Sequence, residues 1–291
     1  MKTFTAAPLF EVQNTLGEGP LWHPIEGCLY WVDIEAGYLY RSEDELQGFR
    51  KTHLKTPIGA FCFTNTDSFI LATGEGFASW TLGQKKPSLI WNPLPDRAGV
   101  RLNDGKVDPA GRFWAGSIDT KQVEGQLYRL DPDGSQHIIL HDIGISNGLD
   151  WSPDRKTMYY TDSYRYTIYA FDYDQETGAI HNQRPFVELP KTRAEIVPDG
   201  LCVDAEGCLW SAQWNGWRVV RYDPQGVPML TVEVPTQRVT SCCFGGEIND
   251  QLFITTARTG LAAAALAAQP HAGDVFIHQT DTIGQVTKLF G

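Results

Sequence analysis

A short run of aromatic, β-branched and small residues recurs six times along this chain, each time after a turn. The clearest copies read GCLYWVD, GRFWAGS, KTMYYTD and GCLWSAQ, and weaker copies read SFILATG and QLFITTA. Successive copies lie 40, 44, 45, 51 and 43 residues apart when these positions are taken as equivalent: Leu29, Phe69, Phe113, Met158, Leu209 and Leu252. Strand-like repeats at this spacing are typical of a β-propeller, in which each repeat forms a four-stranded blade. The sequence therefore predicts an all-β fold, a six-bladed β-propeller formed as one domain by residues 1–291.

The two ends of the chain lie outside the six repeats. Residues 9–12 and 285–290 are both strand-like, and we expect them to pair in one blade and close the ring, which would leave no free sheet edge. Residues 260–269, GLAAAALAAQ, form the one helix-like stretch and are long enough for a turn or two of helix.

Composition restricts the partners and the compartment. The formal net charge is −11, which argues against a nucleic-acid partner, because such proteins carry a basic stripe. The sequence shows no signal-peptide segment and no apolar stretch of membrane-spanning length, so we expect no membrane association and a cytoplasmic location. The six cysteines form no Cys-x-x-Cys pair and are expected to be reduced, buried side chains. A monomer or a weak homo-oligomer is expected.

The segments that precede the repeats share a polar position. They read EGPLWHP, GAFCFTN, NDGKVDP, NGLDWSP, DGLCVDA and TSCCFGG. Equivalent positions in successive blades lie at equal height around a propeller axis, so we expect one ring of side chains in the channel: Glu18, Gly59, Asn103, Asn147, Asp199 and Thr240. Glycine follows Glu18, Asn147 and Asp199, which predicts a close approach of the backbone at the inner ends of these strands.

Two interpretations of this ring compete. Asn-Gly and Asp-Gly are common turn formers, so the pattern can serve chain reversal alone; Glu18 fits that interpretation poorly, because Glu-Gly-Pro is not a favoured turn. Alternatively, Glu18, Asn147 and Asp199 present oxygens to one divalent cation in the channel, where Ca²⁺, Mg²⁺ and Mn²⁺ favour such ligands and Zn²⁺ also accepts them. Three protein ligands leave coordination positions open to water or substrate, which favours catalysis over structural support.

Arg101 lies beside the expected ion site. It precedes Asn103 by two residues and therefore shares its strand face. Its guanidinium is suited to hold substrate hydroxyls or an anionic group. A salt bridge to Asp104 or Asp108 is the alternative that the spacing leaves open.

Several long strings resemble the senescence marker protein/gluconolactonase family, which includes regucalcin and bacterial sugar lactonases. These strings are LGEGPLWHP, RLNDGKVDPAGRFWAG, ISNGLDWSPD, PDGLCVDAEGCLW and FGG…LFITTAR…GL, and they cover nearly the whole chain in family-like order. The resemblance implies a six-bladed propeller with one divalent cation in the channel and activity on aldonolactones. It also implies that Glu18, Asn147 and Asp199 bind the cation, that Arg101 and Asn103 contact the substrate, and that Asp199 acts as acid or base.

The chain departs from the regucalcin-like pattern after Gly116. Those members carry a Glu pair where this sequence reads SIDTK, residues 117–121. Asp119 is the candidate to contact the substrate in their place, with a purely local loop role as the alternative. Lys121 would favour a negatively charged substrate if it faces the channel.

These observations combine into the hypothesis of a metal-dependent lactonase that hydrolyses a sugar aldonolactone of the gluconolactone type to the aldonic acid. Asp199 would help to deprotonate the attacking water. The sequence has no Gly-x-Ser-x-Gly motif that would support an acyl-enzyme route. A phosphotriesterase-like hydrolase and a non-catalytic propeller that binds calcium or a protein remain alternatives.

Loops 119–124, 192–197 and 214–217 are expected to select the sugar. Trp214 and Trp217 either stack on a pyranose face or pack within the fold.

Overall fold

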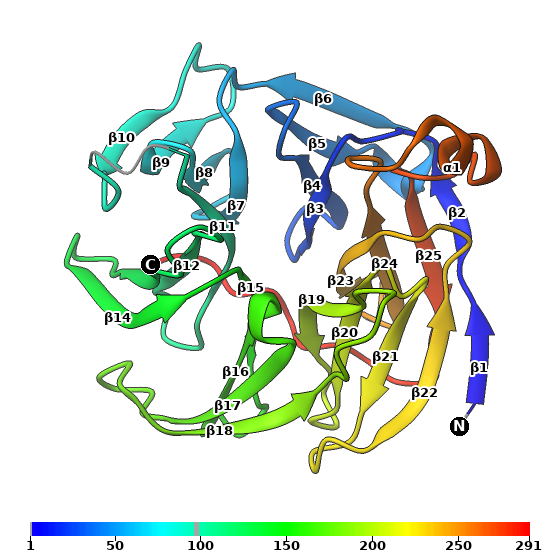
Figure 1. Cartoon of the computed structure of the whole chain (residues 1–291). Helices are drawn as coiled ribbons and strands as arrows, with labels where there is room; N and C mark the ends of the chain where they lie inside the picture. Colours follow the sequence, from blue (N-terminus) through cyan, green and yellow to red (C-terminus); the bar gives the residue numbers. More distant parts are fainter. Residues whose placement is uncertain (1, 96–98) are drawn as a thin grey trace.

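The computed structural model describes residues 2–95 and 99–291, and these residues form six β-sheets around a central channel (Figure 1). Four consecutive antiparallel strands form each of the first five blades in chain order, with the first strand lining the channel. The sixth blade takes three consecutive strands and one from the N-terminal end of the chain. The expectation of a six-bladed propeller is confirmed.

The strands of the first three blades are β3 (Gly17–His23), β4 (Cys28–Asp33), β5 (Tyr38–Ser42) and β6 (Phe49–His53); β7 (Ile58–Phe63), β8 (Ser68–Thr73), β9 (Gly76–Thr81) and β10 (Ser88–Trp91); and β11 (Arg101–Val107), β12 (Phe113–Ile118), β13 (Gly125–Leu130) and β14 (Gln136–Ile143). Those of the last three are β15 (Ser146–Trp151), β16 (Thr157–Asp162), β17 (Thr167–Tyr173) and β18 (Ile180–Glu188); β19 (Val197–Val203), β20 (Leu209–Trp214), β21 (Arg218–Tyr222) and β22 (Pro228–Glu233); and β23 (Val239–Gly245), β24 (Gln251–Thr256) and β25 (Val275–Gln279), completed by β2 (Ala7–Phe10).

The recurring aromatic and β-branched runs form the second strand of every blade. Because each sheet packs between two neighbouring blades, these strands are buried on both faces and lack the polar alternation of a half-exposed strand. The repeat positions Leu29, Phe113, Met158, Leu209 and Leu252 are all 0% exposed. Burying a side chain of this size contributes about 1.5–3 kcal/mol. The repeat that predicts the fold is therefore also the repeat that packs its core.

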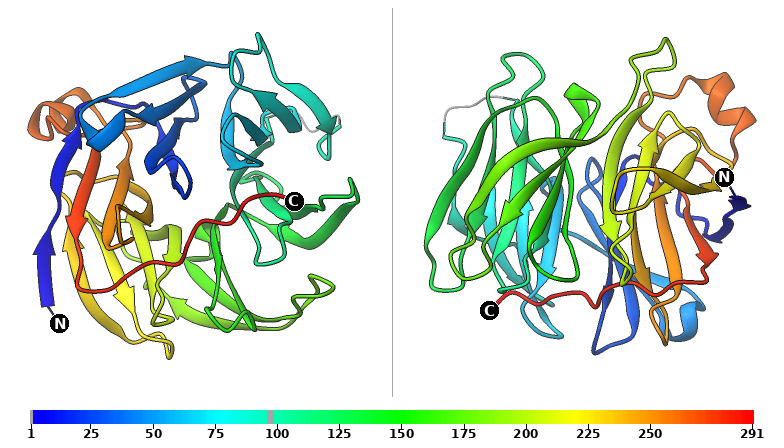
Figure 2. Two further views of the ribbon diagram at one scale, coloured as in Figure 1. Left: turned by 180° about the vertical axis from the view of Figure 1, so that it is seen from behind. Right: turned by 90° about the horizontal axis from the view of Figure 1, so that it is seen from below.

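The ring closes differently from the sequence-based expectation. Strand β2 pairs antiparallel with β25 and completes the sixth blade, while β1 (Lys2–Thr5) adds in parallel to β22 of the fifth blade. The expected pairing of residues 285–290 with residues 9–12 is wrong, because β2 occupies the one open edge of β25. Residues 285–290 form no strand and run across one end of the channel (Figure 2). There the backbone N–H of Phe290 donates to the carbonyl of Phe63 at 2.8 Å, and that of Gly291 donates to Gly111 at 3.1 Å.

Three smaller expectations concern the helix, the cysteines and the membrane. Helix α1 (Ala263–Ala268) lies in the connection between β24 and β25, within the helix-like stretch. All six cysteines are free and buried. No helix in the described part of the chain combines the length and the apolar character needed to cross a membrane.

Candidate functional site in the propeller channel

The strand pairing confirms that the six polar or glycine positions are structurally equivalent. In every blade the register between the first and second strands shifts at or beside this position. In the fourth blade, for example, Ser146 pairs with Asp162 and the next pair is Leu149 with Tyr160, so Asn147 lies in the irregular segment. Such bulges redirect a side chain out of the sheet. Four side chains with a carboxylate or amide oxygen, those of Glu18, Asn103, Asn147 and Asp199, therefore lie at one level of the channel.

The glycines that follow the ring residues have two physical roles. A Cβ on Gly148 would lie 2.4 Å from the backbone nitrogen of Leu201, and a Cβ on Gly200 would lie 2.1 Å from the Ser241 hydroxyl. These two positions confirm the predicted close approach. Gly19 meets no such contact but has a φ of +53°, a conformation that side-chain-bearing residues rarely adopt.

Hydrogen bonds join the ring residues of adjacent blades. The Asn103 amide nitrogen donates to the Asn147 amide oxygen at 3.2 Å and to the Ser146 carbonyl at 2.8 Å. The Asn147 amide nitrogen donates to the Ser163 hydroxyl at 3.0 Å, and Ser163 donates to the Pro198 carbonyl at 2.6 Å, next to Asp199. Sequence reasoning missed Ser163, although it is polar at a position where two other repeats carry Ile34 and Ile118.

Three buried carboxyl groups lie close enough to influence one another. Burial and the nearby Asp104 raise the pKa of Glu18 to about 8. Burial, Glu18 and Asp104 hold the pKa of Asp199 well above its ordinary range, and one Asp199 oxygen, Oδ1, is buried without a hydrogen-bond partner. Asp104, which sequence reasoning considered only as a partner for Arg101, also has its pKa raised by burial, to about 6. A cluster of this kind is stable in its ionised form only with a compensating positive charge.

Arg101 lies beside this cluster. Its guanidinium donates to the Asn103 amide oxygen at 2.6 Å and to the Leu102 carbonyl at 3.1 Å, which confirms the shared strand face. The salt-bridge alternative is wrong within the described residues, where Asp108 pairs with Arg112 at 2.6 Å and no ion pair joins Arg101 to Asp104. The positive charge of Arg101 favours the ionised form of Glu18 and thereby lowers its pKa, but burial outweighs this effect.

Asp119 and the two tryptophans lie at the end of the channel where the inner strands begin, Trp214 as the last residue of β20 and the other two in loops. Asp119 follows β12 and is buried, and its carboxylate accepts hydrogen bonds from the backbone nitrogens of Lys121 and Gln122 at 3.2 and 3.1 Å. It therefore orders its own loop, and contact with a substrate stays a prediction. Trp214 packs under the guanidinium of Arg238, 4.6 Å from ring centroid to Cζ, whereas Trp217 is exposed.

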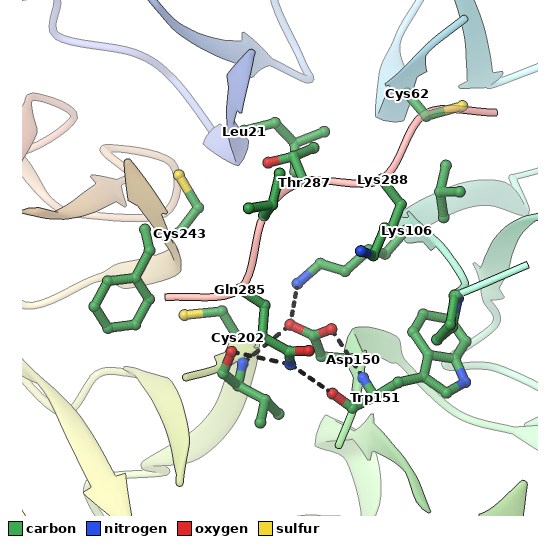
Figure 3. Close-up of a pocket in the computed structure, with 15 residues that line it drawn as sticks. Leu21, Cys62, Lys106, Asp150, Trp151, Cys202, Cys243, Gln285, Thr287 and Lys288 are labelled. Atoms are coloured by element: carbon green, nitrogen blue, oxygen red, sulfur yellow. Dashed lines mark hydrogen bonds and ion pairs between the residues drawn. The ribbon is translucent and has the colours of Figure 1, made fainter. Parts of the chain in front are cut away.

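The ring of Glu18, Asn103, Asn147 and Asp199 is called the upper ring. A second ring, the lower ring, lies three residues further along each inner strand (Figure 3). One residue from each blade lines a cavity of about 60 Å³: Leu21, Cys62, Lys106, Asp150, Cys202 and Cys243. The Lys106 ammonium pairs with Asp150 at 2.9 Å, and residues 285–288 cover the far side of the cavity. The Gln285 amide donates to the Trp151 carbonyl at 2.7 Å and holds this segment in place. A ligand of the upper ring must therefore enter from the opposite mouth.

One compact acidic trio lies elsewhere in the described residues. The ligand atoms of Asp204, Glu206 and Cys208 all lie within 4.8 Å of one another, closer together than the three channel carboxylates. Arg221 pairs with Asp204 at 2.7 Å and with Glu206 at 2.6 Å. Asp204 also accepts from the Cys208 backbone and the Trp210 indole. The charge of Asp204 is already compensated by Arg221, whereas the channel carboxylates form no ion pair in the described residues.

Comparison with known proteins assigns the family. The SMP-30/gluconolactonase/LRE-like region model matches residues 16–258. The chain belongs to this family. It is 38% identical over 268 residues to regucalcin from Oryctolagus cuniculus, with 89% of each chain covered. It is also 38% identical over 283 residues to regucalcin from Danio rerio, covering 95% of this chain and 94% of that one.

The solved structures agree with the assignment. The calcium-binding protein regucalcin from Agrobacterium tumefaciens superimposes with a TM-score of 0.93 at 26% identity, covering 100% of this chain and 99% of that one. The family match spans every ring position from Glu18 to Thr240 and ends before the segment that covers the far end of the channel. Both rings therefore lie within the shared region, whereas the segment that covers the lower ring lies outside it.

Proposed function

We propose that this SMP-30/gluconolactonase family member is a metal-dependent lactonase that opens a sugar lactone to its aldonic acid. The observation that carries the proposal is the buried carboxylate cluster of the upper ring, which forms no ion pair in the described residues and has an unpartnered Asp199 oxygen. Burying like charges without a counter-ion costs several kcal/mol per group. Carboxylate and amide oxygens are also the ligands that hard divalent cations prefer. The donor set thus fits a cation of the Ca²⁺, Mg²⁺, Mn²⁺ or Zn²⁺ class.

In this proposal Glu18, Asn147 and Asp199 hold the cation, and Asn147 is kept in position by Ser163. A bound divalent cation would polarise the lactone carbonyl and supply positive charge where the oxyanion develops. Asp199 takes the proton from the attacking water, because its carboxylate lies at the proposed cation site and one of its oxygens, Oδ1, has no hydrogen-bond partner. The bond between the acyl carbon and the ring oxygen then breaks, and the ring oxygen leaves with a proton as the new hydroxyl.

Arg101 and Asn103 orient the sugar. Their mutual hydrogen bond of 2.6 Å fixes the guanidinium, while its remaining N–H groups stay available to substrate oxygens. Fixed groups that orient the sugar lower the activation barrier, because the entropy of aligning the substrate is lost on binding and not in the transition state. Asp119 and its loop are proposed to line the sugar-binding side.

Acid release from glucono-δ-lactone, followed with a pH indicator, tests the proposal. We expect turnover with added divalent metal, loss with EDTA, and recovery on adding back single metals. Asp199→Asn, nearly isosteric, should lower kcat by at least about a hundredfold, as is typical of a lost general base. The exposed Asp154→Asn is the matched control and should leave kcat unchanged. Wild-type turnover that survives EDTA, or an active Asp199 variant, would contradict the mechanism.

A calcium-binding role without catalysis is the second candidate, because the Agrobacterium relative is described as a calcium-binding protein. It predicts calcium binding by calorimetry together with no turnover of any sugar lactone. The same assay with an organophosphate triester tests the phosphotriesterase-like alternative.

A further inference from the structure

Arg238 occupies the same register as Arg101. The former precedes the ring residue Thr240 by two positions, just as Arg101 precedes Asn103, and strand pairing confirms the alignment of the two strands. The same position in the other four blades is apolar: Leu16, Pro57, Ile145 and Val197. The third and sixth blades are three blades apart in a six-bladed ring and therefore face each other. Two guanidinium-bearing positions thus lie on opposite sides of one channel mouth.

The arginines at this mouth differ from most other arginines in the described residues in the kind of group that they bond to. Seven arginines pair with carboxylates: Arg41, Arg50, Arg112, Arg129, Arg165, Arg184 and Arg221. Four at strand ends on this side meet neutral acceptors instead: Arg101 with Asn103, Arg218 with Gln213, Arg238 with backbone carbonyls and Arg258 with Gln13. Their positive charges are left available to a ligand.

The Arg238 side chain is held in place by contacts with two neighbouring segments. Its guanidinium packs over the Trp214 ring, donates to the carbonyls of Thr259 and Gly260, and leaves its buried Nε–H without an acceptor. Across residues 2–95 and 99–291, no carboxylate pairs with it. A fixed planar guanidinium with spare donors is suited to bind a carboxylate or a phosphate through two parallel hydrogen bonds.

We propose that Arg238 binds an anionic substituent of the substrate, so that the preferred lactone carries a terminal oxyanion group. This inference rests on the proposed lactonase function and specifies its substrate class. The cation-binding ring fixes the lactone carbonyl near the axis, and Arg238 holds the charged end of the sugar at the rim of the sixth blade. Arg101, across the mouth, remains assigned to the sugar hydroxyls.

The test compares three lactones of one carbon skeleton: neutral glucono-δ-lactone, the carboxylate-bearing glucaro-1,4-lactone and 6-phosphoglucono-δ-lactone. Wild-type kcat/KM should be higher for at least one anionic lactone, and this advantage should shrink with rising ionic strength. Arg238→Gln should lower kcat/KM for that lactone about tenfold to a hundredfold, the usual effect of losing a charged hydrogen bond, and change the neutral lactone less than about threefold. The carboxylate and phosphate arms show which anion is used.

Two variants separate binding from structural damage. Arg238→Lys keeps the charge and should retain part of the anionic preference, whereas Arg155→Gln, an exposed arginine in the turn between β15 and β16, should have no effect. Equal loss for neutral and anionic lactones in Arg238→Gln, or a wild-type preference for the neutral lactone, would overturn the inference.

The inference is decided separately from the proposed function. If no lactone is hydrolysed with any metal, the lactonase proposal fails. Calorimetry with glucarate and gluconate then tests Arg238 directly. Tighter binding of glucarate, lost in Arg238→Gln, supports the assignment, and equal affinities for the two acids contradict it.

Discussion

Replacing Glu18 with Gln gives a quantitative test of the idea that the channel carboxylates need a cation. Burial and Asp104 raise the pKa of Glu18 from 4.5 to about 8. In the metal-free protein the folded state therefore keeps a proton that the unfolded chain has lost. The stability from this group is fully present below pH 4.5 and is lost as the pH rises toward about 8. The Gln side chain does not titrate, so Glu18→Gln removes this pH dependence.

The magnitude follows from the size of the pKa change. Between pH 4.5 and about 8, each rise of one pH unit lowers the unfolding free energy of the metal-free wild type by at most about 1.4 kcal/mol. Between pH 5 and pH 7, Glu18→Gln should therefore gain on the order of 2–3 kcal/mol of unfolding free energy relative to the wild type. For a chain of this size the gain corresponds to roughly 3–5 °C in Tm. Calcium should have the opposite effect, stabilising the wild type more at pH 7 than at pH 5 and the variant much less.

Thermal unfolding in EDTA and in calcium, at pH 5, 6, 7 and 8, measures both effects. Glu26→Gln is the control, because hydrogen bonds from Arg41 and Tyr30 overcome burial and lower the pKa of Glu26. Loss of that carboxylate should destabilise the protein, and the difference from the wild type should shrink as the pH falls. If the stability of the metal-free wild type relative to Glu18→Gln did not change from pH 5 to pH 7, this result would refute the argument. Equal stabilisation of both proteins by calcium would also refute it.

Three further changes test the supporting structure. Gly148→Ala forces a Cβ to 2.4 Å from the Leu201 nitrogen, so we expect loss of calcium-dependent stabilisation and a Tm lower by several degrees in a melting experiment. Lys106→Met leaves the half-buried Asp150 without its cation and should lower the unfolding free energy by about 1.5–3 kcal/mol in urea unfolding. Deleting residues 285–291 removes five hydrogen bonds worth about 1 kcal/mol each, so the Tm should fall while the KM for a lactone stays unchanged.

The fold was predictable because its signal is local and repeated. Each repeat places a buried strand after a turn, and six copies at similar spacing define both the blade number and the register of the ring. Glu18, Asn147 and Asp199 follow from that register without any knowledge of long-range contacts. Ring closure was not predictable in the same way. Residues 9–12 and 285–290 both suit a strand, and only competition for one sheet edge decides between them.

Parts of the site escaped prediction for a different reason. Asp104 follows a ring residue directly, and a regular strand would turn successive side chains to opposite sides. Only the bulge between Leu102 and Gly105 places it among the channel carboxylates. The register places Arg238 two residues before Thr240, as Arg101 precedes Asn103, but the sequence does not show that the sixth blade faces the third or that Arg238 lacks a carboxylate partner in the described residues. Both properties are set by tertiary structure.

The two rings of the channel show how one repeat serves stability and function at different heights. In the lower ring Lys106 and Asp150 compensate each other, and the C-terminal segment covers them, so this level needs no ligand. In the upper ring Glu18, Asp104 and Asp199 are buried and form no ion pair in the described residues, and the guanidinium of Arg101 bonds to an amide instead of a carboxylate. Lys106 and Arg101 favour the ionised forms of Asp104 and Glu18, but burial outweighs them and keeps the pKa values of all three carboxyl groups raised. The proposed divalent cation would supply the positive charge that favours the ionised form of this cluster.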